Sequence, residues 1–86
     1  MGRKKQFPWT KYIFHWEDPT GDSAWLTSND MDKLSPAIIT TEAYLYSKDK
    51  KYIKTFASYI KEEDGSYTFG DVNCFLASGL VKMVKI

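Results

Sequence analysis

The sequence predicts an all-β, mainly antiparallel fold: a small five-stranded barrel of the SH3-like or Sm-like type with one short helical turn. Three observations lead to this prediction: period-two alternation, segments rich in β-branched and aromatic residues, and Gly, Pro and Asp turn sequences between them. Residues 11–17 alternate, with Tyr12, Phe14 and Trp16 on one face, as in a half-buried strand. Closure into a barrel is expected because it removes exposed strand edges.

Four more strands are expected after the first, since apolar and β-branched residues recur between short polar turns. They cover residues 38–47, 52–60, 67–76 and 80–86. The Asp64-Gly65 pair is typical of a hairpin turn, and Gly70 indicates a bulge or bend. The break at residues 77–79 predicts a sharp corner before the last strand.

A long connection follows the first strand. Residues 18–23 concentrate turn formers, which predicts a well-structured loop. Thr27 and Ser28 can cap a short helical turn that runs to Leu34, and Pro36 prevents its continuation.

Length and composition limit the organisation of the chain. Its 86 residues suffice for one hydrophobic core, so we expect a flexible basic tail over residues 1–8 and a single domain over residues 9–86. The net charge of +1 is too small for a field that attracts duplex nucleic acid. No apolar stretch is long enough to cross a membrane, and a single cysteine indicates a reducing compartment, so a cytoplasmic protein is expected.

The titratable residues give no pattern of an enzyme. The sequence holds one histidine, His15, and one cysteine, Cys74, with no catalytic-triad or phosphate-loop motif, and no metal or cofactor is expected. His15 is on the strand face opposite Trp16, as a rim imidazole would be. Cys74 alternates with Val72 and Leu76, which predicts a buried, inert thiol. We therefore expect a protein that binds without catalysis.

Two tryptophans that bracket an acidic, hydroxyl-bearing loop form the most specific pattern in the chain. Indoles supply flat surfaces for a planar ligand, and the loop supplies hydrogen-bonding groups. Tyr44 and Tyr46 share a strand face and can present two phenols to a ligand or a neighbouring subunit. The candidate ligand-binding residues are Trp16, Asp18, Ser23, Trp25, Thr27, Tyr44 and Tyr46. The alternative is structural: the aromatic residues pack in the core or anchor the loop, and the acids cap turns.

Short motifs resemble a family of phage-encoded proteins. The resemblance spans about residues 12–86 and rests on Trp16-Glu17-Asp18, Ser23-Ala24-Trp25, Thr40-Thr41-Glu42-Ala43-Tyr44, Phe75-Leu76 and the closing segment 80–86. Many relatives carry a proline near residues 75–77, which this chain lacks. Small phage proteins of this size include sponges that sequester the cyclic nucleotides used as alarm signals by anti-phage systems such as CBASS. The resemblance thus implies an anti-defence protein of the host cytoplasm.

A cyclic nucleotide needs stacking surfaces for its bases and donors for its phosphates. Aromatic and hydroxyl groups are abundant, whereas the cations near the predicted strands are lysines: Lys11, Lys48, Lys50, Lys51 and Lys54. A ligand of that size is expected to lie between subunits of a homo-oligomer, which 14 aromatic residues in so small a chain also favour. A protein-interaction module that binds or inhibits a host protein, and a single-stranded nucleic-acid binder, remain alternatives.

Overall fold

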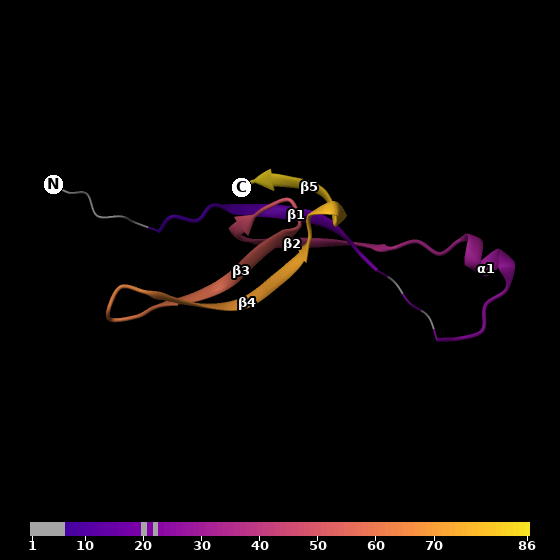
Figure 1. Cartoon of the computed structure of the whole chain (residues 1–86), viewed down its shortest axis with the longest axis horizontal. Coiled ribbons are helices and arrows are strands. Elements are labelled where there is room, and N and C mark those ends of the chain that lie inside the picture. Colours follow the sequence, from indigo (N-terminus) through magenta and orange to yellow (C-terminus); the bar gives the residue numbers. More distant parts are fainter. Residues whose placement is uncertain (1–6, 20, 22) are drawn as a thin grey trace.

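Five antiparallel strands form one sheet in the computed structural model, which describes residues 7–19, 21 and 23–86. In chain order the elements are β1 (Lys11–Asp18), α1 (Ser28–Asp32), β2 (Ala37–Lys48), β3 (Tyr52–Lys61), β4 (Tyr67–Leu76), a 3₁₀ turn η1 (Ala77–Gly79) and β5 (Leu80–Lys85). The strand order across the sheet is β4-β3-β2-β1-β5, so the last strand returns beside the first (Figure 1). The mainly antiparallel fold with one short helix is confirmed.

The predicted barrel is not closed. In the described sheet β4 and β5 are the two edge strands and do not pair with each other. The molecule is elongated, with extents of 66 × 22 × 21 Å. Figure 1 shows the reason: the β3–β4 hairpin extends beyond the sheet at one end, and the connection that carries α1 extends from the other.

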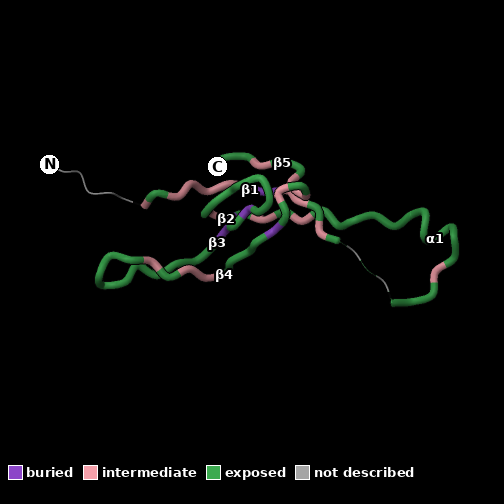
Figure 2. The backbone as a smooth tube through the Cα atoms, viewed as in Figure 1, coloured by how far each residue is buried: buried purple, intermediate pink, exposed green. Residues whose placement is uncertain are grey.

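The core is small and lies where β1, β2, β3 and β4 cross. Its buried apolar side chains are Phe14, Ala43, Ile53 and Phe75. Phe14 and Phe75 meet edge to face, with ring centroids 6.0 Å apart. Figure 2 shows that buried residues are confined to this middle region of the chain trace. Tyr12 and Trp16 pack against the core, which confirms the predicted inner face of the first strand.

A second apolar cluster lies around the base of the β3–β4 hairpin. It contains eight aromatic side chains in mutual contact: Phe7, Trp9, Tyr44, Tyr46, Phe56, Tyr59, Tyr67 and Phe69. Phe56 is buried at its centre and stacks on Tyr44, its partner in the β2–β3 register. The sequence predicted a flexible tail over residues 1–8. Residues 1–6 of this segment lie outside the described residues, whereas Phe7 packs into this aromatic cluster.

The turns follow the sequence closely. Gly65 takes φ 92°, and the Asp64 carboxylate accepts hydrogen bonds from the Ser66 backbone at 2.9 Å and hydroxyl at 2.6 Å. The irregularity expected at Gly70 falls one residue later, where Asp71 has φ 52°, a conformation that aspartate tolerates better than most residues. The Ser58 hydroxyl donates to the Asp71 carboxylate at 2.5 Å and fixes this bend.

The β2–β3 turn gives a testable dependence of stability on pH. The Asp49 carboxylate accepts hydrogen bonds from the backbone N–H groups of Tyr52 and Lys51, and these bonds lower the pKa of Asp49 below its ordinary value of 3.8. A carboxyl group with a lowered folded pKa stabilises the fold above its unfolded pKa. That contribution is lost as the pH falls through the folded value.

We therefore expect Asp49→Ala to lower the melting temperature at pH 7 and to have a progressively smaller effect below pH 3.8. Thermal unfolding of both proteins between pH 7 and pH 2.5 measures this difference. Glu63→Ala, a change in the other hairpin turn, serves as the matched control. A difference between Asp49→Ala and the parent protein that is unchanged across this range would contradict the role given to the ionised carboxylate.

Candidate functional site

The structure places the sequence-predicted site residues in three separate regions. Trp16 and Asp18 lie at the end of β1 and line one groove. Tyr44 and Tyr46 belong to the aromatic cluster. Ser23, Trp25 and Thr27 lie on the connection between β1 and β2. No single site brings the seven residues together, so each region is considered by itself.

The first region, the corner groove, has a volume of about 580 Å³ and forms where the end of β1 meets η1. Its lining residues are Trp16, Glu17, Asp18, Pro19, Pro36, Tyr52, Cys74, Phe75, Leu76, Ser78 and Gly79. A close approach of the chain shapes this corner, since a Cβ atom added to Gly79 would lie 3.1 Å from the Glu17 carbonyl oxygen. Two carboxylates and no cation line the corner groove, which makes it a poor site for phosphate.

Trp16 is half-buried and held on two sides. Its indole stacks on Phe75 with ring centroids 4.7 Å apart and an interplanar angle of 15°. The indole Nε1–H donates a hydrogen bond to the Thr41 hydroxyl at 3.0 Å. The Trp16 ring therefore braces β1 against β4 and β2, and one part of it faces the corner groove.

The connection after β1 carries exposed groups. Trp25 is fully exposed, at 102% relative accessibility. The Thr27 hydroxyl accepts a hydrogen bond from the Asp30 backbone N–H at 3.1 Å, and the Asp30 carboxylate accepts one from the Thr27 N–H at 3.4 Å. This reciprocal capping box starts α1 as the sequence indicated and uses the Thr27 hydroxyl structurally. Thr20 and Asp22 in the same loop lie outside the described residues.

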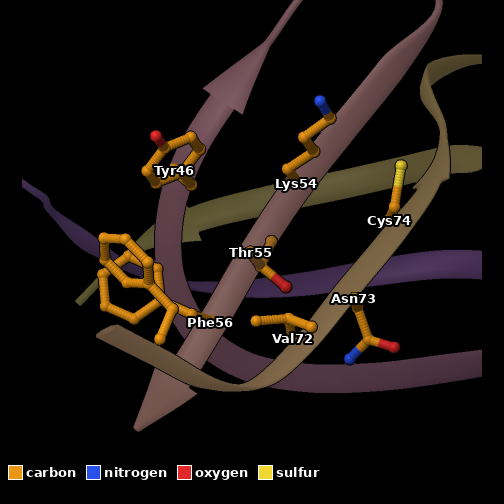
Figure 3. Close-up of a pocket in the computed structure, with 8 residues that line it drawn as sticks. Tyr46, Lys54, Thr55, Phe56, Val72, Asn73 and Cys74 are labelled. Carbon is orange, nitrogen blue, oxygen red and sulfur yellow. The ribbon is translucent and has the colours of Figure 1, made fainter. Parts of the chain in front are cut away.

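The aromatic groove, a third region, has a volume of about 260 Å³ and lies beside the aromatic cluster (Figure 3). It is lined by Tyr46, Lys54, Thr55, Phe56, Phe69, Val72, Asn73 and Cys74. The rings of Phe56 and Phe69, 4.6 Å apart between centroids, and of Tyr46, 5.2 Å from Phe69, provide its flat apolar surface. Lys54, with its ammonium group, and Asn73, with its amide, are exposed residues of the lining.

Thr55 gives the aromatic groove its most unusual polar group. The residue is 2% exposed, and its hydroxyl has no hydrogen-bond partner among the described residues. A buried hydroxyl without a partner costs about 1–3 kcal/mol, and native proteins rarely leave one so. The hydroxyl is enclosed on the face of β3 opposite Phe56, so the groove offers a ligand its aromatic walls and its exposed polar residues, Lys54 and Asn73.

Cys74 corrects the sequence interpretation of a buried thiol. The residue is exposed and lies on the edge strand β4, where it borders both grooves. Val72 and Leu76, which alternate with it, are also exposed, at 62% and 55%. Alternation was identified correctly, but this face of β4 is not the core face, which Phe75 occupies. His15 is at the rim as expected, and its Nδ1 lies 3.1 Å from the Thr40 hydroxyl.

Most residues of the aromatic groove were not among the sequence-predicted ligand-binding residues. Of the seven, only Tyr46 lines it, although Lys54 was noted as a candidate phosphate contact. Thr55 lies between Lys54 and Phe56 in a predicted strand, where a threonine gives no special signal. Phe7 and Trp9 flank Pro8 at a spacing of two, a signal that could have indicated their shared packing, whereas residues 1–8 were expected to form a tail.

No protein-family model matches the chain, and no curated protein and no solved structure matches it either. Two further observations concern the described part of the chain alone. No group of three or more His, Cys, Asp or Glu residues there is placed to hold a metal ion. No helix in residues 7–19, 21 and 23–86 is long and apolar enough to span a membrane.

The two tryptophans at the ends of the loop are expected to respond differently to removal. Trp16→Ala should lower the free energy of unfolding by about 3–5 kcal/mol, because it removes a stacked, half-buried ring. Trp25→Ala should change it by less than about 0.5 kcal/mol at concentrations low enough to keep the chain monomeric. Urea unfolding followed by circular dichroism measures both values. Unfolding of the Trp25→Ala protein would show that this indole anchors the loop.

Proposed function

We propose that the protein is a non-enzymatic binding protein that holds a nucleotide-type ligand in the aromatic groove. The observation that carries this proposal is the groove itself, which is walled by the rings of Tyr46, Phe56 and Phe69 and has the exposed Lys54 in its lining. A planar heterocycle can lie against Phe69 and Tyr46.

Each part of such a ligand finds a matching group. Stacking of a base on an aromatic side chain is worth about 1–3 kcal/mol and does not depend on the base. The exposed Asn73 amide supplies both a donor and an acceptor for a base edge. The Lys54 ammonium is the cation for a phosphate, and the neighbouring turn adds Lys48, Lys50 and Lys51 against one carboxylate, Asp49. The local charge therefore favours an anionic ligand.

The size of the groove restricts the ligand. A volume of about 260 Å³ lies just below the range of about 300–1,000 Å³ for drug-sized ligands. It suits one nucleotide unit, so a cyclic dinucleotide would place its second base outside this groove. The resemblance to short phage proteins supports cyclic nucleotides as the class of ligand and sequestration in the host cytoplasm as the role.

A protein-interaction module that binds a host protein is the second candidate, and a specific observation favours it. Trp25 is fully exposed, and Met31 and Leu34 on the same connection are about half exposed. Tryptophan is enriched among the residues that dominate binding energy at protein interfaces. This candidate uses the β1–β2 connection and makes no use of the aromatic groove, so the two can be separated by mutation.

The groove is tested with the purified full-length chain, by thermal shift and calorimetry against nucleoside monophosphates and cyclic di- and trinucleotides. Phe69→Ala should weaken binding about fivefold or more, because it removes a stacking surface worth about 1–3 kcal/mol. Thr55→Val should leave binding unchanged. The same change should keep or raise the melting temperature of the free protein, because it removes an unpartnered hydroxyl. Lys54→Ala should weaken binding of phosphate-bearing ligands about tenfold or more.

The matched control is Lys61→Ala, which removes a lysine from the far end of the same strand. It should leave binding unchanged. Binding that withstands both Phe69→Ala and Lys54→Ala would place the ligand elsewhere. If no nucleotide binds while Trp25→Ala abolishes capture of a host protein, the second candidate is correct.

A further inference from the structure

The connection between β1 and β2 projects from the sheet with apolar side chains outward. We name its residues 23–36 the arm; Figure 1 shows it extending beyond the end of the sheet, with α1 near its tip. Trp25, Met31 and Leu34 have exposures of 102%, 55% and 43%. Figure 2 shows the arm as exposed along nearly its whole length. An apolar surface of this kind marks an interaction site.

The helix in the arm gains little stability from packing against its own sheet. Helix α1 has five residues, far fewer than the about 12–15 that make an isolated helix even marginally stable, and none of the five is buried. The capping box of Thr27 and Asp30 defines where it starts. Burial of Met31 and Leu34 against another surface would supply the packing that usually stabilises an amphipathic helix.

A second exposed surface lies on the edge strand β5. Val81, Val84 and Ile86 are 57%, 41% and 62% exposed, and the other edge of β5 is paired with β1. An edge strand with free backbone groups and apolar side chains is a template for pairing with another chain. Its exposed edge adjoins the arm in the fold, because Leu80 pairs with Trp16 near the point where β1 enters the connection.

The two surfaces have opposite charge. The arm itself contains Asp30, Asp32 and Lys33, a net charge of −1, and the residues just before it, 17–22, add three carboxylates, which gives −4 for residues 17–36. Residues 80–86 contain Lys82 and Lys85 and no acid, a net charge of +2. Charge complementarity of this kind orients association and selects the partner.

We infer that the arm of one copy of this chain packs along β5 of a second copy, and that the second copy returns the same contact. A two-fold axis generates both contacts at once, because each chain carries both surfaces. Arm and β5 both run roughly along the long axis of the molecule (Figure 1), so two antiparallel copies can lay each arm beside the other's sheet. A foreign protein would need one surface that matches the arm and another that matches β5, whereas a second copy of this chain has both already.

The shape of the single chain agrees with this arrangement. Its radius of gyration is 17.7 Å, against about 12 Å expected for a compact domain of this length. A standard interface covers about 800 Å² on each partner, and one buried tryptophan supplies about 150–250 Å². Trp25 is thus the largest single contributor that the arm offers. The inference is independent of the proposed function, since no lining residue of the aromatic groove takes part.

Light scattering coupled to size-exclusion chromatography of the full chain tests the arrangement. We expect a mass of twice 10.0 kDa at tens of micromolar, and dissociation on dilution. Two charge-reversed proteins, Lys82→Glu/Lys85→Glu and Glu17→Lys/Asp18→Lys/Asp32→Lys, bring β5 to −2 and residues 17–36 to +2. Each should be monomeric alone, and the two should form a dimer when mixed, because mixing restores opposite charges at both contacts. Both leave the Thr27–Asp30 capping box intact.

Trp25→Ser is a second variant that tests the same contact without altering a charge or a buried residue. It should also be monomeric. Lys61→Glu, on the β3–β4 hairpin, is the matched control and should remain dimeric. Circular dichroism checks that every variant is folded. A monomeric parent protein, a dimer that survives Trp25→Ser and both charge reversals, or reversed proteins that stay monomeric when mixed would each overturn the inference, whatever the ligand experiments show.

Discussion

The packing of Phe75 against Trp16 and Phe14 is the contact on which the rest of the structure depends. It joins β4 to β1, two strands that are not neighbours in the sheet order, and so it folds the sheet over its own inner face. Ile53 and Ala43 complete this core from the two strands in between. Because a core with so few buried side chains is marginal by itself, the remaining apolar groups must contribute elsewhere.

The aromatic cluster is that second contribution, and it explains how the groove arises. Phe56 is buried on one face of β3, while Ile53 and Thr55 are buried on the other, so the middle of β3 is covered on both sides. The Thr55 hydroxyl is thereby enclosed without a hydrogen-bond partner among the described residues. The same packing that stabilises the hairpin forms a flat aromatic surface on the other face of β3, which is a suitable arrangement for a small planar ligand.

The sequence predicted the local elements well because turn chemistry and alternation act over short distances. The strands, the capping box at Thr27 and the corner at residues 77–79 lie within a residue or two of the expected positions. Barrel closure and the buried state of Cys74 were predicted wrongly, since both depend on which sheet face is covered by distant strands. The grouping of site residues also depends on such contacts: Trp16 and Trp25 are nine positions apart, but only Trp16 folds back onto the core.

The aromatic residues of this short chain lie in the hairpin cluster, in or against the core, and at two exposed positions. Of its 14 aromatic residues, eight form the hairpin cluster and four, Tyr12, Phe14, Trp16 and Phe75, belong to or pack against the core. Tyr52 is partly exposed and Trp25 fully so, although the indole is the side chain with the most to gain from burial. Because twelve of the fourteen aromatic rings are buried or clustered, the exposed Trp25 indole is the ring that the inferred contact with a second copy would cover.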